Sequence, residues 1–237
     1  MELSALKSGG KETLQITEIY RSIQGESTFA GLACVFVRLT GCDLRCTYCD
    51  SAYAFTGGTR MSLGEIIARV DQLPCDLVEI TGGEPLLQKA VFPLMQRLCD
   101  AGKTVLLETS GAHDVSGVDP RVHRIVDLKC PSSGECGRNF FSNLDKVCSR
   151  DEVKFVIGTR EDFEWARDQL RKYAIDQKVR CVLFSPAFKT AAAAGQTKGH
   201  DGLDNRLLVE WILEEKLPVR FQLQMHKYVW EPGRKGV

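Results

Sequence analysis

Apolar and polar residues alternate in blocks along the chain, and most blocks have the length of one strand or one helix. Short runs rich in β-branched and aromatic residues predict buried strands, and the first such run is at residues 34–39. Further strands are predicted at residues 76–80, 105–107, 125–127, 153–157, 182–184 and 219–223. Because these strands are almost continuously apolar and helix-length segments separate them, we expect a parallel sheet covered by helices.

Helices are predicted at residues 61–73, 91–98, 160–172 and 203–215. Ser62 is expected to cap the first, with Glu65 three residues later completing a capping box. Thr159 has the residue type of an N-cap for the third. Gly102 is expected to end the second.

The number of strand–helix units limits the fold. A closed eight-fold barrel typically takes about 250 residues, and this chain of 237 residues contains fewer than eight such units. We therefore predict an α/β fold built as an incomplete, open TIM-type barrel of parallel strands with outer helices. No linker, repeat or low-complexity stretch interrupts the pattern, so residues 1–237 are expected to form a single domain, with residues 1–14 as a disordered leader.

Charge and hydropathy exclude several classes of partner. The chain has 31 Lys and Arg residues and 31 Asp and Glu residues, so its overall charge gives no reason to expect nucleic acid or an anionic membrane as a partner. It contains no apolar stretch of the roughly 20 residues that a membrane span needs, and its first residues lack the apolar core of a signal peptide. We expect a cytoplasmic protein.

Three of the ten cysteines are clustered, at positions 42, 46 and 49. The others are scattered through apparently buried segments, as expected for a reducing compartment. A closed structural zinc site takes four ligands, whereas a tetranuclear iron–sulfur cluster on three thiolates leaves one iron open to another ligand. The spacing favours the cluster, and an unusual zinc site or reduced structural thiols remain alternatives.

Polar motifs follow the predicted strands. They are Thr81-Gly82-Gly83-Glu84-Pro85, Glu108-Thr109-Ser110-Gly111, Asp127-Leu128-Lys129, Ser185-Pro186 and Gln224-Met225-His226-Lys227. In parallel α/β folds ligands bind at the carboxyl ends of the strands. We therefore expect these segments and the cysteine loop to converge on one site.

The C-x3-C-x2-C loop after a strand, with Tyr48 just before its third cysteine, resembles the radical S-adenosylmethionine (SAM) superfamily. Members of that superfamily bind the methionine amino and carboxylate groups of SAM to the open iron of a [4Fe–4S] cluster and generate a 5'-deoxyadenosyl radical. The resemblance implies a radical SAM core and a cluster bound by Cys42, Cys46 and Cys49. The second motif is similar to the superfamily's GGE motif, which implies that Gly82, Gly83 and Glu84 hold the methionine amino group.

Longer matches resemble the 7-carboxy-7-deazaguanine synthase family. They lie at residues 20–27, 36–42, 48–51, 108–111, 130–134 and 226–230. This resemblance implies conversion of 6-carboxy-5,6,7,8-tetrahydropterin to 7-carboxy-7-deazaguanine, with ring contraction and ammonia release, in queuosine and 7-deazapurine biosynthesis. No catalytic side chain is expected beyond the cofactor-generated radical. A reductant protein such as flavodoxin or ferredoxin would supply electrons, and a homodimer is expected because partial barrels often shield their open edges by dimerising.

The family's roles are carried over motif by motif. The pterin is assigned to Ile23, Gln24, Gly25, Arg38, Thr109, His226 and Val237. SAM is assigned, beside the GGE motif, to Tyr48, Cys49, Asp50, Gly111, Asp127, Leu128, Lys129, Ser185, Pro186, Ala187 and Phe188. Arg38 would pair with the substrate carboxylate, because its fork of donors matches that group.

Two positions depart from the family pattern. Mg²⁺ is held in the family by a hydroxyl just after the third cysteine, usually from threonine, and this chain has Ser51 there. Serine keeps an oxygen ligand for a hard cation. Residues 127–129 read Asp-Leu-Lys where many relatives have Ser-Pro-Lys, which changes the cofactor contacts expected there.

Three other functions are compatible with parts of the pattern. A glycyl-radical activase of the same superfamily would have little use for Arg38 or for the Gln24-Gly25-Glu26 loop. A non-catalytic zinc or iron–sulfur module would be separated from both enzymes by its iron and sulfide content. A regulatory pterin-binding protein would bind the ligand without cleaving SAM.

Overall fold

The structure is a computed structural model that describes residues 12–191, 199–231 and 234–237. Nine strands form one sheet in the order β3-β1-β2-β4-β5-β6-β7-β8-β9. The strands are β1 (Thr13–Ile23), β2 (Ala33–Leu39), β3 (Thr59–Ser62), β4 (Leu77–Gly82), β5 (Thr104–Thr109), β6 (His123–Asp127), β7 (Glu152–Ile157), β8 (Cys181–Pro186) and β9 (Arg220–Phe221). The α-helices are α1 (Leu63–Asp71), α2 (Val91–Asp100), α3 (Arg160–Tyr173), α4 (Asn205–Glu215) and α5 (His226–Val229). Short 3₁₀ helices are η1 (Ala52–Ala54), η2 (Pro85–Leu87), η3 (Pro131–Ser133), η4 (Cys136–Arg138), η5 (Phe141–Asp145) and η6 (Ile175–Gln177).

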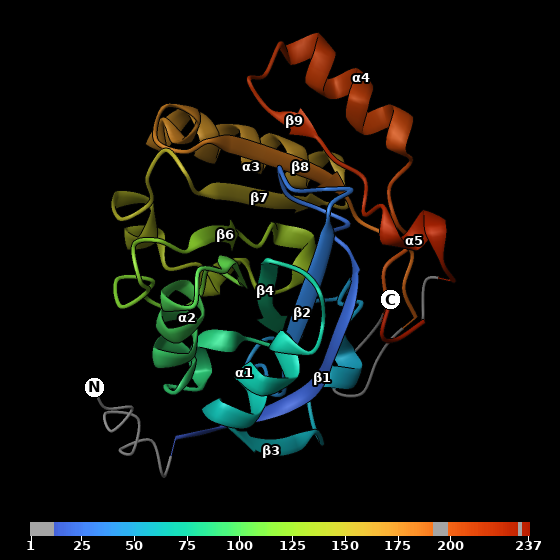
Figure 1. The fold of residues 1–237 in the computed structure, drawn as a ribbon. Helices are drawn as coiled ribbons and strands as arrows, with labels where there is room; N and C mark the ends of the chain where they lie inside the picture. The colour runs from blue at the N-terminus through green and yellow to red at the C-terminus, as the bar shows by residue number, and fades with distance from the viewer. Residues whose placement is uncertain (1–11, 192–198, 232–233) are drawn as a thin grey trace, which may run out of the picture.

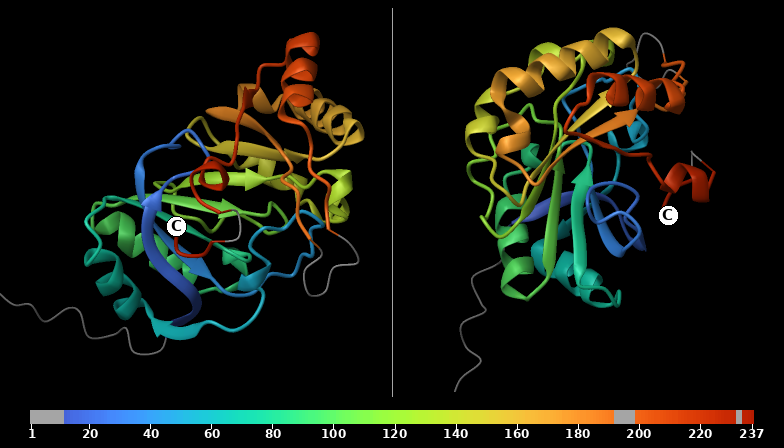
Figure 2. Two further views of the ribbon diagram at one scale, coloured as in Figure 1. Left: turned by 90° about the vertical axis from the view of Figure 1, so that its right-hand side faces the viewer. Right: turned by 90° about the horizontal axis from the view of Figure 1, so that it is seen from above.

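The sheet is an open barrel, as predicted. In the part of the sheet ordered β2-β4-β5-β6-β7-β8-β9, each strand runs parallel to the next. The edge strands β3 and β9 do not pair with each other, so the barrel stays open. Figures 1 and 2 show the sheet curving, with α1, α2 and α3 along its outside and α5 beside the C-terminus. The predicted strand at residues 219–223 is reduced to the two residues of β9.

An antiparallel extension was not predicted. The eleven residues of β1 pair antiparallel with both β2 and β3. The expectation of a disordered leader is therefore wrong for Thr13 and Leu14, and Leu14 is only 1% exposed. Residues 1–11 lie outside the described residues. Ile23 ends β1, so the Gln24-Gly25-Glu26 loop lies between β1 and β2.

The predicted helix caps are confirmed. Ser62 and Glu65 form a capping box at α1, which begins at Leu63 because residues 59–62 pair with β1. Thr159 caps α3 in the same way, with Asp162 as the reciprocal acid. No helix in the described part of the chain is long and apolar enough to cross a membrane.

The two faces of the sheet carry different residues because side chains alternate along each strand. The outer face packs against the helices in the main core, to which β2 contributes Val35, Val37 and Leu39. A separate apolar cluster lies on the inner face and contains Cys34, Phe36, Leu77, Leu106 and Ile125.

Charged residues continue the inner face toward the carboxyl ends of the strands. Two positions after Phe36, Leu77, Leu106 and Ile125 come Arg38, Glu79, Glu108 and Asp127, and all four line one pocket. The inside of the barrel is therefore apolar at one end and polar at its mouth, where the site lies.

Candidate active site

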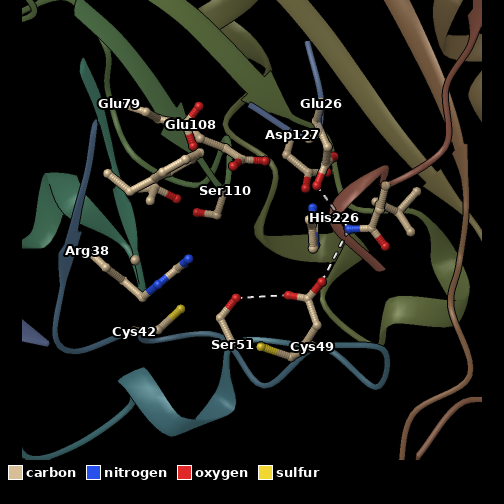
Figure 3. Close-up of a pocket in the computed structure, with 18 of the residues that line it drawn as sticks. Glu26, Arg38, Cys42, Cys49, Ser51, Glu79, Glu108, Ser110, Asp127 and His226 are labelled. Atoms are coloured by element: carbon tan, nitrogen blue, oxygen red, sulfur yellow. Dashed lines mark hydrogen bonds between the residues drawn. The ribbon is translucent and has the colours of Figure 1, made fainter. Parts of the chain in front are cut away.

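The pocket at the mouth of the barrel is enclosed from three sides (Figure 3). The strand ends form its floor, and the cysteine loop after β2 forms one wall. Residues 23–26 and the C-terminal segment, described at residues 225–231 and 234–237, form another wall. Cys42, Cys46 and Cys49 all line it.

The cysteine loop is fastened to the segment after β6. Thr47 donates from its backbone N–H to the Ser133 carbonyl at 3.0 Å, and from its hydroxyl to the Ser132 carbonyl at 2.8 Å. All ten cysteines lie in the described part of the chain, and none forms a disulfide. Burial raises the pKa of the Cys49 thiol to about 12. A metal must therefore displace the proton when this thiolate binds it.

The spacing of the thiols bears on the metal they could hold. Among the described residues, no three His, Cys, Asp or Glu side chains lie close enough together to bind one metal ion. In a tetranuclear cluster each thiolate binds a different iron, so wider spacing is required. The donor set fits a cluster better than a zinc ion.

The glycine pair at the end of β4 is required by backbone packing. A Cβ atom at Gly82 would lie 2.2 Å from the Leu39 carbonyl oxygen, and one at Gly83 would lie 2.0 Å from the Gly41 carbonyl oxygen. Glu84 donates from its backbone N–H to that same Gly41 oxygen at 2.7 Å. The glycines therefore join the end of β4 to the start of the cysteine loop.

The Glu84 side chain points away from the pocket into the protein. It is fully buried, and its carboxylate accepts hydrogen bonds from the Thr109 hydroxyl at 2.9 Å and from the backbone N–H groups of Ser110 and Leu86. In this arrangement Glu84 fixes the ends of β4 and β5 relative to each other. It does not line the pocket.

Asp50 joins the cysteine loop to the C-terminal segment. Its carboxylate pairs with Lys227 at 2.6 Å and accepts a hydrogen bond from the Ser51 hydroxyl at 2.8 Å. Burial opposes the charge of Asp50, but Lys227 and the Ser51 hydroxyl outweigh it and lower the pKa. The Ser51 hydroxyl is thereby held at the edge of the pocket.

The C-terminal segment also closes over the loop after β1. Met225 donates from its backbone N–H to the Gly25 carbonyl at 3.0 Å. A Cβ at Gly25 would lie 2.4 Å from Nδ1 of His226, so a larger residue there would displace the imidazole. This close approach explains the glycine.

Arg38 projects from β2 into the pocket. Its Nε pairs with Glu18 at 2.8 Å, and Nη2 donates to the Tyr20 hydroxyl at 2.9 Å. These neighbours on β1 fix the guanidinium plane and leave Nη1 without a hydrogen bond to any described residue.

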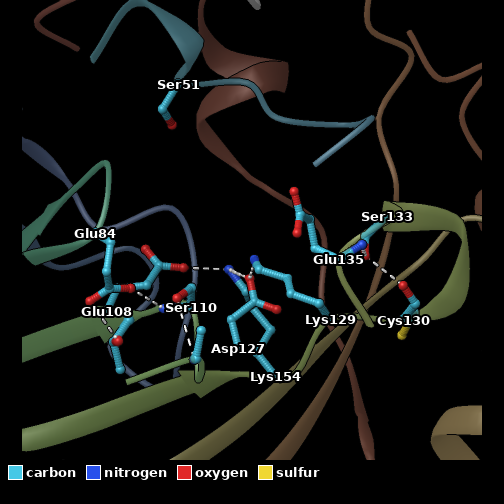
Figure 4. A network of polar contacts seen from close by, with 12 residues as sticks. Ser51, Glu84, Glu108, Ser110, Asp127, Lys129, Cys130, Ser133, Glu135 and Lys154 are labelled. Atoms are coloured by element: carbon cyan, nitrogen blue, oxygen red, sulfur yellow. Dashed lines mark hydrogen bonds and ion pairs between the residues drawn. The ribbon is translucent and has the colours of Figure 1, made fainter. Parts of the chain in front are cut away.

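A buried network of charges on β5, β6 and β7 was not predicted (Figure 4). Lys154 pairs with Glu108, with Glu26 at 3.0 Å and with Asp127 at 3.5 Å, and Asp127 also pairs with Lys129 at 2.9 Å. Burial disfavours the Lys154 charge, but the carboxylates outweigh it and raise its pKa. A lone lysine in an otherwise apolar run, as in Val-Lys-Phe-Val-Ile at residues 153–157, is the sequence signal for such a residue, since unpaired charges are rarely buried.

Comparison with known proteins identifies the family. The superfamily model for radical SAM proteins matches residues 36–134. The chain is 51% identical over 226 residues to the 7-carboxy-7-deazaguanine synthase of Koribacter versatilis, covering 94% of this chain and 100% of the relative. The synthase of Chlorobaculum tepidum is 47% identical, covering 94% of this chain and 97% of the relative. The chain belongs to the 7-carboxy-7-deazaguanine synthase family.

Solved structures agree with the fold. The crystal structure of QueE from Escherichia coli matches with a TM-score of 0.66 at 24% identity, over 92% of this chain and 96% of that chain. Streptococcus suis SuiB bound to S-adenosylmethionine matches with a TM-score of 0.54 at 15% identity, over 78% of this chain and 48% of that chain. Membership of the radical SAM superfamily implies a [4Fe–4S] cluster and SAM as cofactors, and membership of the synthase family decides against the activase and the non-catalytic module.

The predicted residues of this family site are mostly gathered in one place. All seven residues assigned to the pterin line the pocket. Of those assigned to SAM, the pocket is lined by Tyr48, Cys49, Asp50, Gly82, Gly83, Asp127, Lys129 and Phe188. The others, besides Glu84, are Gly111, Leu128, Ser185, Pro186 and Ala187, and they do not line it.

Those remaining residues lie behind or beside the pocket. Leu128 is part of the main core. Pro186 and Ala187 line a neighbouring hollow, which Phe188 shares with the main pocket. A Cβ at Gly111 would lie 3.1 Å from the Asp127 carbonyl oxygen, so this glycine allows two strand ends to approach closely.

Unsatisfied polar atoms concentrate among the residues assigned to SAM. In the described part of the chain, four buried side-chain polar atoms have no hydrogen-bond partner, and three of them are Tyr48 Oη, Asp127 Oδ1 and Ser185 Oγ. Since buried polar groups are normally satisfied, the unpaired oxygens of Tyr48 and Asp127, two residues that line the pocket, are available to a ligand there, whereas Ser185 does not line it.

Proposed function

We propose that this enzyme converts 6-carboxy-5,6,7,8-tetrahydropterin to 7-carboxy-7-deazaguanine, with contraction of the six-membered ring and release of ammonia. The observation that supports this most is the single pocket that contains both the three clustered thiols and all seven residues assigned to the pterin. The iron–sulfur cluster, SAM and the pterin can therefore bind next to one another in the same pocket.

Cys42, Cys46 and Cys49 would hold the cluster, whose open iron is the place for SAM. When bound, the cluster and SAM supply the radical chemistry that the ring contraction needs. The unpaired oxygens of Tyr48 and Asp127 support a cofactor site at this wall of the pocket, since both offer a hydrogen bond that the protein leaves unused.

Arg38 would bind the substrate carboxylate. Glu18 and Tyr20 hold the guanidinium by Nε and Nη2, so Nη1 can donate to an incoming anion without a change of conformation. Thr109, Gln24 and His226 surround the same space and would orient the ring. The C-terminal segment lines one side of the pocket, where excluding water would strengthen each of these polar contacts.

Ser51 would hold Mg²⁺ together with the substrate carboxylate. Its hydroxyl hydrogen is directed to Asp50, so its lone pairs remain available to a hard cation. Asp50 adds a nearby negative charge that favours the ion. On the family resemblance we also propose a flavodoxin or ferredoxin as reductant, a homodimer, a cytoplasmic location, and no nucleic-acid or membrane partner.

The test is an anaerobic incubation of reconstituted protein with dithionite, SAM, Mg²⁺ and 6-carboxy-5,6,7,8-tetrahydropterin, followed by mass analysis of the small molecules. A product with the mass of 7-carboxy-7-deazaguanine supports the proposal. Cleavage of SAM without conversion of the pterin would refute the substrate while leaving the cluster in place.

A further inference from the structure

Arg45 lies inside the cysteine loop, but the family motifs assign it no role and it does not line the pocket. It directly precedes Cys46, and its Nη1 donates to the carbonyl oxygens of Cys42 and Leu44, each at 2.8 Å. Its Cζ lies 4.2 Å from the centre of the Phe55 ring. These contacts fold the side chain back onto the loop, so its charge is held beside the cluster-binding cysteines.

The Arg45 charge has no carboxylate partner in the described part of the chain, where its guanidinium donates only to these carbonyl oxygens. Asp43, the acid within the loop, is instead paired with Arg138 at 2.6 Å and with His113 at 3.1 Å. The Glu135 carboxylate accepts a hydrogen bond from the Arg45 backbone N–H at 2.6 Å and not from its side chain. The loop therefore carries one cation that no ion pair compensates.

Fixed charges beside an iron–sulfur cluster affect its reduction potential. A [4Fe–4S] cluster bound by three thiolates is an anion when oxidised, and one-electron reduction makes it more negative. A cation held close to it attracts the reduced form more strongly than the oxidised form. The cation therefore raises the potential, and a nearby anion lowers it.

We propose that Arg45 raises the reduction potential of the cluster at the three clustered cysteines, and that the Glu135 carboxylate lowers it. Since the cluster has to accept an electron before SAM is cleaved, Arg45 increases the share of the enzyme that a given reductant can activate. The inference rests on the proposed binding of the cluster by these cysteines and does not depend on the identity of the substrate.

The test is an anaerobic redox titration of the reconstituted protein, in which the electron paramagnetic resonance signal of the reduced cluster is measured. Arg45→Gln removes the charge, and the ratio of reduced to oxidised cluster at a fixed potential should fall about three- to tenfold. This change corresponds to a midpoint about 30–60 mV more negative, at about 59 mV per tenfold change for one electron.

Two further substitutions separate charge from loop structure. Arg45→Lys keeps the charge, and its ratio of reduced to oxidised cluster should stay within about twofold of wild type. Glu135→Gln keeps an oxygen acceptor for the Arg45 backbone N–H and removes a negative charge, so its ratio should rise about twofold or more. A distorted loop gives no reason for Arg45→Gln and Glu135→Gln to shift the midpoint in opposite directions.

Substitutions outside the pocket control for the net charge of the protein. Arg69→Gln removes an exposed cation on α1, and Glu215→Gln removes a carboxylate at the end of α4 that pairs with Arg167 and Arg171. Neither residue lines the pocket, and both variants should keep the wild-type midpoint.

Iron and sulfide content and melting temperature are measured on every variant, because the midpoints are comparable only between proteins that hold an intact cluster. If Arg45→Gln does not retain the cluster, Arg45→Met replaces it. That substitution is also neutral and keeps a long side chain beside Phe55. Its midpoint should fall by the same amount.

The outcomes distinguish this inference from the proposed function. An unchanged midpoint in the neutral Arg45 variants, or an equal fall in Arg45→Lys, would overturn the inference, while conversion of the pterin would leave the proposed function standing. If the midpoints shift as expected but wild-type protein does not convert the pterin, the inference holds and the proposed substrate is wrong. If wild-type protein takes up no iron–sulfur cluster, both fail.

Discussion

At Glu79 the sheet buries a carboxyl group whose protonation links stability to pH. In the folded state its pKa is raised, chiefly by burial and then by Glu108, whereas in the unfolded chain a glutamate titrates near pH 4.3. Above about pH 5 the folded state therefore binds one proton more than the unfolded state, and this contribution to stability falls by about 1.4 kcal/mol per pH unit until the folded-state pKa is reached. Glu79→Gln removes that dependence.

We expect Glu79→Gln to become more stable relative to wild type as the pH rises from 5.5 to 7.5. For a domain of this size the melting-temperature difference should change by about 2–5 °C per pH unit, which thermal unfolding of cluster-free protein would measure. Glu215→Gln is the control and should show no such trend. A pH-independent difference between Glu79→Gln and wild type would mean that Glu79 is ionised in the folded protein.

The cysteines give a second prediction at this scale. Cys42→Ala should leave too few thiolates for the cluster, so bound iron and sulfide should be lost after anaerobic reconstitution and turnover should fall below detection. Cys148→Ala is the matched control, because Cys148 is exposed and does not line the pocket. Retained product formation by Cys42→Ala would contradict the cluster assignment.

Single residues also show what the sequence could and could not predict. The cysteine loop and Arg38 carry short motifs, so their place in the pocket could be predicted. Glu79 is the one charged residue of β4, and Lys154 is one of two in β7. Their partners lie on other strands and on the loop after β1, so these contacts form only in the folded sheet. The resemblance implies that Gly82 and Gly83 hold the amino group of SAM, and the structure adds a reason for the glycines that the sequence did not show, the close approach of the backbone of residues 39–41.

At the scale of elements, buried strands and capped helices were predictable because each has a local signal. The strand β1 was missed because its start was taken as part of a leader, although alternating apolar and polar residues are typical of a half-buried strand. Its pairing with β2 decides which side chains of β1 contact site residues, and in that pairing Glu18 lies opposite Arg38. β1 therefore positions Arg38, although the sequence of β1 alone gives no sign of this role.

The two capping boxes provide a matched test. Glu65 at α1 is exposed and bonds only to Ser62. Asp162 at α3 is fully buried and accepts hydrogen bonds from backbone N–H groups of Ser132, Gly158 and Thr159 as well as from the Ser132 hydroxyl. Asp162 thus ties α3 to the segment that holds the cysteine loop.

Glu65→Ala should reduce the free energy of unfolding by about 1 kcal/mol or less. Asp162→Ala should reduce it by about 3 kcal/mol or more, because several buried donors lose their acceptor. Chemical denaturation of both variants measures the difference. Equal losses would show that the Asp162 bonds to the cysteine-loop support are energetically unimportant.

At the scale of the whole molecule, the open barrel ends in two short edge strands. The edge strand β3 has four residues and β9 has two. Short edges offer little template for pairing with another chain, so edge protection alone gives only a weak reason for dimerisation. The proposed homodimer therefore has to rest on another surface, and sedimentation equilibrium would measure its presence.

The C-terminal segment covers the pocket but is not part of the core of the barrel. It follows the last strand of the sheet and is attached to the pocket by the Met225–Gly25 hydrogen bond and the Lys227–Asp50 ion pair, and His226 and Val237 face the pocket. The main core contains no residue after Phe221 among its described members. Removal of this segment should therefore open the site without unfolding the barrel.

We expect a chain that ends at Gln224 to keep its cluster and its substrate-independent cleavage of SAM, while the KM for the pterin rises by about tenfold or more, as for the loss of one or two charged or buried polar contacts. Met225→Ala is the control, because it removes a partly exposed side chain and keeps the backbone hydrogen bond to Gly25. Iron content, melting temperature and steady-state kinetics are measured on both. If the shortened chain keeps the wild-type KM, the pterin is held by the strand ends and the cysteine loop alone; if it loses its cluster, the Lys227–Asp50 pair stabilises the cysteine loop itself.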